Sequence, residues 1–325
     1  MVRRRPALAR RSKRVFSYWR SETRTLRQGL VALTLSTVAG FGAGLTLAHL
    51  TGTLTDLPGL LVLIPAAVGI RGSIFGAIGA RLGTANAAGL LTIDLRRGGV
   101  LRQNVDVAIL TTFSCSVWVA VLARVAITVF GQPSISLGDL VLISLVGGAI
   151  GSAVVLAITL AISALSFRLG WDLDSVSTPM VTALGDMTTL PSLFVATFLV
   201  HNAAVAAIGA IVCAVVGGIA TIRSFVVRDP RLRRIVLELT AATLLTSLLD
   251  LLSGGLQQGR LVELASVPVL LSLTILIGYY LAVITSRFGL DPDNQGVSTI
   301  ASVMDLTGVA VVLFVATWVG VLGRG

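Results

Sequence analysis

The sequence has few charged residues, few aromatic residues and only two cysteines. Charged side chains make up 12% of the 325 residues and aromatic side chains 6%, whereas 55% of the residues are hydrophobic and the mean hydropathy is +0.93. Several apolar runs exceed the roughly 18 residues that mark a membrane span. This composition predicts a polytopic membrane protein.

These apolar runs also lack the period-two alternation that is typical of barrel strands. Only helices and closed barrels can satisfy their backbone hydrogen bonds in lipid. We therefore expect an all-α transmembrane bundle. The two cysteines, Cys115 and Cys213, lie inside apolar runs and are expected to be small core residues.

No small-residue cleavage site follows the first apolar run, which argues against a signal peptide. Residues 1–27 contain ten Arg or Lys and one acid, Glu22, and so carry +9 of the formal net charge of +10. A basic tail beside a membrane span is typical of a topology signal and of contact with lipid headgroups. We expect a cytoplasmic tail over residues 1–27 and no nucleic-acid partner.

The breaks between apolar runs predict nine spans. They lie near residues 29–50, 59–91, 104–130, 139–167, 178–200, 203–222, 235–254, 262–286 and 297–322, and the fifth and sixth meet at a turn at His201-Asn202. The loops 92–103 and 223–234 are rich in arginine, whereas 51–58 and 131–138 contain no basic residue. This alternation predicts a multi-pass protein of the cell membrane with its N-terminus in the cytoplasm.

Two aspartate-rich stretches repeat one another at a constant offset of 119 residues. The offset pairs Arg168 with Arg287, Gly170 with Gly289, Asp172 with Asp291, Asp174 with Asp293, Asp186 with Asp305, and Thr188 with Thr307. The preceding spans are the fourth and the eighth, so the two copies are predicted to be parallel. The second copy has no counterpart of the hairpin 29–91.

This repeat predicts four segments. The basic tail 1–27 precedes a complete five-span copy over 28–202, a linker helix and basic loop follow over 203–234, and a partial three-span copy occupies 235–325. Both aspartate-rich connections are expected to face the cytoplasm.

Asp186 and Asp305 are predicted to lie at the same depth in the hydrocarbon. If Pro179 is the first residue of its helix, Asp186 lies two turns in, where a charged residue costs about 2.5–3.5 kcal/mol. Two carboxylates that converge across a pseudo-two-fold axis either share a proton or attract a cation. A hydrated Mg²⁺ fits one or two carboxylates with hydroxyl and carbonyl oxygens, so Thr188 and Thr307 join the candidate ligands. A structural hydrogen-bonding role for each aspartate is the alternative.

Four further aspartates, Asp172, Asp174, Asp291 and Asp293, are expected at the cytoplasmic mouth of this path. Solvated loop acids and helix caps are the alternative for each of them.

The second span contains Pro65 and glycines at three- or four-residue spacing, together with Arg71 and Arg81. Such a segment either packs closely against neighbouring helices or forms a broken helix whose carbonyls line a polar cavity.

The aspartate-rich loop, the following span with its Asp, and this Pro-Gly-rich span resemble the membrane domain of the MgtE magnesium transporters. The two-copy arrangement is similar to their eukaryotic solute-carrier relatives and the archaeal and bacterial counterparts. The family's second-span pattern, Pro-x-x-x-Gly-x-x-Gly-Asn, reads Pro65 to Ser73 here, with serine in place of asparagine. The resemblance implies that Asp186 and Asp305 line the ion pathway and that Mg²⁺ is the transported ion.

We therefore expect a transporter or channel for divalent cations rather than an enzyme. A membrane scaffold of the same fold that no longer transports is the alternative, because the hairpin and the asparagine are missing. An intramembrane aspartyl protease is a weaker third candidate, since its signature is incomplete around Ala183-Leu184-Gly185-Asp186. The sequence leaves a homodimer open.

Overall fold

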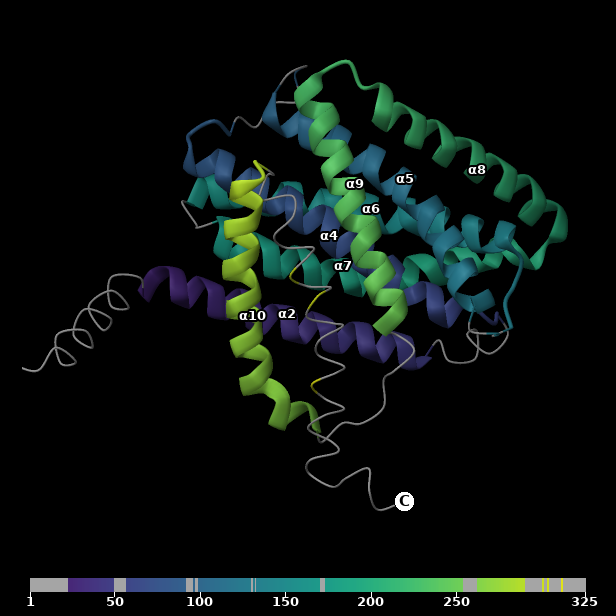
Figure 1. Ribbon diagram of the computed structural model, residues 1–325, viewed down its shortest axis with the longest axis horizontal. Coiled ribbons are helices and arrows are strands. Elements are labelled where there is room, and N and C mark those ends of the chain that lie inside the picture. Colours follow the sequence, from purple (N-terminus) through teal and green to yellow (C-terminus); the bar gives the residue numbers. More distant parts are fainter. Residues whose placement is uncertain are drawn as a thin grey trace, which may run out of the picture.

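The computed structural model describes residues 23–49, 57–91, 96, 99–129, 131, 133–169, 173–253, 262–289, 300, 303 and 311. Its elements are α2 (Thr23–His49), α4 (Leu60–Ala87), α5 (Val100–Val129), α6 (Leu137–Leu169), α7 (Leu173–Thr197), the 3₁₀-helix η1 (Phe198–His201), α8 (Ala203–Val226), α9 (Pro230–Ser253) and α10 (Val262–Arg287) (Figure 1). No strand occurs among these residues, which confirms the predicted all-α class.

Five of these helices are long and apolar enough to cross a membrane. They are Val62–Ala87, Val100–Val129, Leu137–Ser166, Met180–His201 and Ala203–Val226, which correspond to the second through sixth predicted spans. Helices α2, α9 and α10 fall on the first, seventh and eighth predicted spans. The predicted ninth span, 297–322, lies outside the described residues apart from positions 300, 303 and 311.

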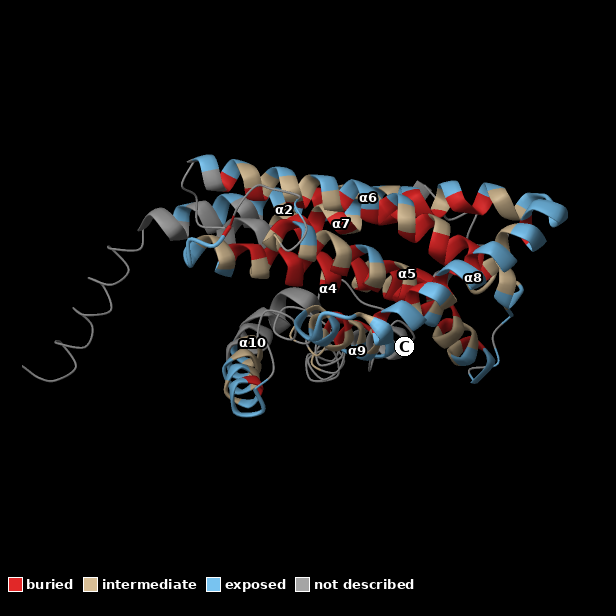
Figure 2. Ribbon diagram, turned by 90° about the horizontal axis from the view of Figure 1, so that it is seen from above, coloured by how far each residue is buried: buried red, intermediate tan, exposed pale blue. Residues whose placement is uncertain are grey.

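Helix α7 lies at the centre of the first five helices and packs against α2, α4 and α6. Helix α5 packs against α4 and α6 and also against α8 and α9. Seen from above, α9 and α10 lie on the side of α4 and α5 that faces away from α6 and α7 (Figure 2). The buried positions concentrate where α4, α5, α6 and α7 meet, so the core belongs to the segment that carries Asp186.

Helices α7 and α8 join through a tight corner at the predicted His201-Asn202 turn. Helix α7 passes into η1, which ends at His201. The Asn202 side chain then caps α8, because its Oδ1 accepts hydrogen bonds from the backbone N–H groups of Ala204 at 3.1 Å and Val205 at 3.3 Å. The prediction of two spans in 178–222 is confirmed.

Successive helices alternate in direction, which places several connections at one end of the bundle. Arg81 near the end of α4 donates from Nε to Asn104 Oδ1 near the start of α5 at 3.1 Å. Leu232 at the start of α9 lines the same cavity as Asp106 of α5 and Arg223 of α8. The helix ends that the two predicted basic loops connect, those of α4 with α5 and of α8 with α9, therefore lie at one end of the bundle.

Candidate ion site

Helix α7 positions Asp186, and it begins earlier than the sequence predicted. The helix starts at Leu173, so Pro179 lies inside it and is not its first residue. Pro179 is the seventh residue of α7, so the helix continues through it without the hydrogen bond to the carbonyl four residues earlier. Asp186 is half-buried and lies six residues into the span Met180–His201, roughly 9 Å from its start.

The threonines that follow Asp186 are bonded to their own helix. The Thr188 hydroxyl donates to the Leu184 carbonyl at 2.8 Å, and the buried Thr189 hydroxyl donates to the Gly185 carbonyl at 2.6 Å. A residue two positions along a helix lies on the opposite side, whereas one three positions along is a neighbour. Thr189 thus lies closer than Thr188 to the side of α7 that carries Asp186.

The structure describes some of the eight predicted ion-site residues and not others. Asp186 and Thr188 have described side chains, and Asp174 lies in the first turn of α7, with only its backbone described. Asp172, Asp291, Asp293, Asp305 and Thr307 lie outside the described residues. Within the described ranges, no group of three or more His, Cys, Asp or Glu side chains could hold a metal ion.

The broken-helix interpretation of the second span is wrong. Helix α4 runs continuously from Leu60 to Ala87 with Pro65 inside it. Pro65 is the sixth residue of the helix, so its carbonyl clash falls within the first two turns. Gly72 packs against α7, since a Cβ at Gly72 would lie 3.4 Å from Thr182 Cγ2. The close-packing interpretation of these glycines fits the structure.

Arg71 is buried inside the bundle, with 2% of its surface exposed. Its Nη1 donates to the Ala67 carbonyl one turn earlier, and its Nε has no hydrogen-bond partner among the described residues. The guanidinium lies against Gly148 and Gly151 of α6. The sequence placed Arg71 in the second span but did not predict that its guanidinium is buried against α6. The closely spaced glycines of α6 are the sequence feature that accompanies this burial.

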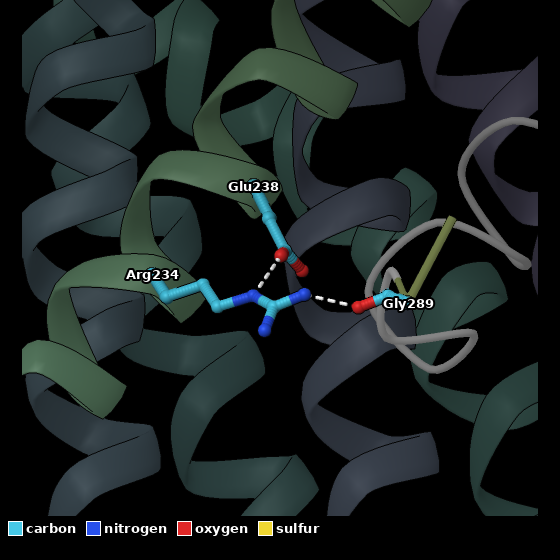
Figure 3. A network of polar contacts seen from close by, with 3 residues as sticks. All are labelled: Arg234, Glu238 and Gly289. Atoms are coloured by element: carbon cyan, nitrogen blue, oxygen red, sulfur yellow. Dashed lines mark hydrogen bonds and ion pairs between the residues drawn. The ribbon is translucent and has the colours of Figure 1, made fainter. Parts of the chain in front are cut away.

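The end of α10, which precedes the predicted loop with Asp291, contacts the start of α9. Arg234 donates from Nε to Glu238 Oε1 at 2.6 Å and from Nη2 to the Gly289 carbonyl (Figure 3). Gly289 has a positive φ of 64° and ends the helical segment of α10, a conformation that glycine adopts without strain. The end of α10 therefore lies beside the start of α9.

Two of the cavities lined by described residues lie beside these helices, and neither has the lining of a cation site. A cavity of about 450 Å³ between α2 and α7 is lined by apolar side chains with Ser36 as its polar exception. A cavity of about 470 Å³ between α5, α8 and α9 contains one carboxylate, Asp106, which pairs with Arg102 at 3.1 Å. Asp106 and Asp186 each lie six residues into a candidate span, and Asp106 is paired with Arg102 one turn earlier on the same helix.

These features define the class of the chain as a polytopic helical membrane protein. Within it, residues 64–196 match the MgtE family of divalent cation transporters. This segment covers α4 to α7 almost completely and includes Asp186, so it is an MgtE-like membrane domain. No curated protein and no solved structure matches the chain.

Proposed function

We propose that this chain is a transporter or channel for divalent cations and that Mg²⁺ is its ion. The observation that supports this most strongly is Asp186, a carboxylate on α7 within both a candidate span and the MgtE-like segment. A carboxylate in hydrocarbon requires a partner or a water-filled path. Magnesium keeps several of its waters and binds through one or two carboxylates, so a hydrated ion can bind at Asp186 without a full protein cage.

The ion path is proposed to lie between two parallel copies of the same fold. The offset of 119 assigns α9 to α5 and α10 to α6. In support, α9 starts at the same end of the bundle as α5, and α10 returns toward that end as α6 does. Asp305 and Thr307 would then match Asp186 and Thr188 across the path, in a ninth span.

The four loop aspartates complete this proposal at the mouth of the path. Asp172, Asp174, Asp291 and Asp293 would concentrate divalent cations by their summed field. The N-terminal tail and the arginine-rich loops would face the cytoplasm, and the tail would contact lipid headgroups of the cell membrane.

Uptake of Mg²⁺ into liposomes tests the function directly. We expect uptake by the wild type and a reduction of roughly tenfold or more in Asp186→Asn, which keeps the size of the side chain but removes its charge. Asp139→Asn is the matched control, because this carboxylate lies at the start of α6, where it accepts a hydrogen bond from Ser136 at 2.7 Å. The control should transport like the wild type.

Thermal unfolding of the same proteins separates an ion-binding role from a structural one. If Asp186 exists to hold a cation, Asp186→Asn should unfold at the same or a higher temperature, because a costly charge has been removed. Asp305→Asn should act non-additively with Asp186→Asn, since both would bind one ion. Wild-type uptake by Asp186→Asn would refute the ion path and favour the non-transporting scaffold.

A further inference from the structure

Arg71 places a positive charge near the middle of α4, within the MgtE-like segment. It lies nine residues into the span Val62–Ala87, roughly 14 Å from the start of that span. None of the ion pairs formed among the described side chains involves Arg71. The remaining contacts of the guanidinium decide whether this charge is compensated.

Two glycines of α6 create the space for the guanidinium. A Cβ at Gly148 would lie 3.3 Å from Arg71 Nη2 and 2.5 Å from Ser116 Oγ. A Cβ at Gly151 would lie 3.1 Å from Arg71 Nε and 3.3 Å from Ser192 Oγ. The guanidinium thus lies against the backbone of these glycines, and Ser116 of α5 and Ser192 of α7 border the same space. Among the described residues its hydrogen-bond acceptor is the Ala67 carbonyl, and none of these groups carries a charge that would neutralise it.

The same arginine packs through its Cβ against the helix that carries Asp186. A Cβ at Gly185, the residue before Asp186, would lie 3.9 Å from Arg71 Cβ. Ser192, which borders the same space at Gly151 as the guanidinium, donates to the Thr188 carbonyl of α7 at 2.7 Å. A cation beside Asp186 is therefore exposed to the field of a fixed positive charge in a medium of low dielectric constant. This repulsion is twice as large for a divalent as for a monovalent ion.

We propose that Arg71 is a specificity-determining residue that weakens the binding of divalent cations in the path. This inference rests on the proposed function. Conduction requires binding that is favourable enough for an ion to enter and weak enough for it to leave. A carboxylate site in a membrane binds a divalent cation tightly. A buried guanidinium nearby repels that cation and shortens the time for which it stays bound.

Charge-removing and charge-keeping variants test this inference through the KM for Mg²⁺. We expect Arg71→Met to lower the KM by a factor on the order of ten and to weaken competition by K⁺ relative to Mg²⁺. Arg71→Lys keeps the charge and should stay near the wild-type KM. Arg102→Met is the matched control, because Arg102 is about half exposed at the start of α5 and should leave the KM unchanged.

The outcomes separate this inference from the function on which it rests. An unchanged or raised KM in a folded Arg71→Met protein, with uptake by the wild type intact, overturns the role of Arg71 alone. Absence of Mg²⁺ uptake by the wild type overturns the proposed function and this inference with it. If Arg71→Met does not fold, Arg71→Gln takes its place, since its amide can still donate to the Ala67 carbonyl. A lower unfolding temperature in both Arg71→Lys and Arg71→Gln, with the KM unchanged, would assign Arg71 a structural role and refute the inference.

Discussion

Gly217 of α8 packs tightly against Val117 of α5, and replacing it with alanine should push these helices apart. A Cβ at Gly217 would lie 2.1 Å from Val117 Cγ2 and 3.3 Å from Leu145 Cδ1. Non-bonded carbons normally stay about 3.5–4.0 Å apart, so α8 must shift by more than 1 Å or Val117 must leave its rotamer. Overpacking of this kind costs about 1–3 kcal/mol, against about 1 kcal/mol gained from the helix propensity of alanine.

The next residue provides the control for this prediction. A Cβ at Gly218 would meet nothing within 4 Å, so Gly218→Ala gains the same propensity without a clash. We expect Gly217→Ala to unfold at a lower temperature than Gly218→Ala in detergent, by an amount equivalent to about 1–3 kcal/mol. Val117→Ala removes the clashing methyl groups and should restore part of the loss, which a double-mutant cycle measures. Equal unfolding temperatures for the two alanine variants would refute the reasoning.

Two further predictions concern the α6–α7 contact and the mouth of the path. Gly147→Ala should destabilise the protein more than Gly217→Ala, because its Cβ would lie 2.9 Å from the Leu193 Cα and 3.1 Å from the Leu193 N. These are backbone atoms, which cannot move away by a change of rotamer. Thermal unfolding measures the loss, and a smaller loss than in Gly217→Ala would contradict the prediction. Replacing Asp172, Asp174, Asp291 and Asp293 together by asparagine should weaken the apparent affinity for Mg²⁺ more at low than at high ionic strength, since exposed charges are screened by salt. An uptake assay measures this affinity at both ionic strengths. An equal loss of affinity at low and at high ionic strength would identify these residues as caps or solvated acids.

Much of the helical framework could be predicted from the sequence, because apolar run length and turn residues are local signals. The corner at His201-Asn202 is an example, since an asparagine that caps the next helix is readable from its position between two apolar runs. The start of α7 and the continuity of α4 were not predicted. In both cases the sequence pattern predicts a boundary or a break at a proline, whereas Pro65 and Pro179 lie inside continuous helices that tolerate the loss of one backbone hydrogen bond each.

Less of the candidate site than of the helical framework could be predicted from the sequence. Asp186 could be selected from the sequence, because a carboxylate in an apolar run is unusual wherever it points. The environment of Arg71 could not, because it depends on glycines and serines from three helices that are distant in sequence. Small residues in an apolar span are equally compatible with lipid contact and with close packing, so only the arrangement of the helices shows that Gly148 and Gly151 enclose the guanidinium.

The contrast between α4 and α8 has a consequence for biogenesis. About 72% of the apolar stretch of α4 is buried inside the bundle, against 22% of that of α8, which buries only the small residues Ala206, Cys213, Gly217, Ala220 and Ser224. A single arginine at the centre of an isolated helix costs about 2.5–3.5 kcal/mol on insertion scales. Helix α8 can therefore leave the translocon for lipid on its own. We expect helix α4, with Arg71 near its centre, to gain stability in the bilayer once α6 and α7 have been synthesised and pack around the arginine.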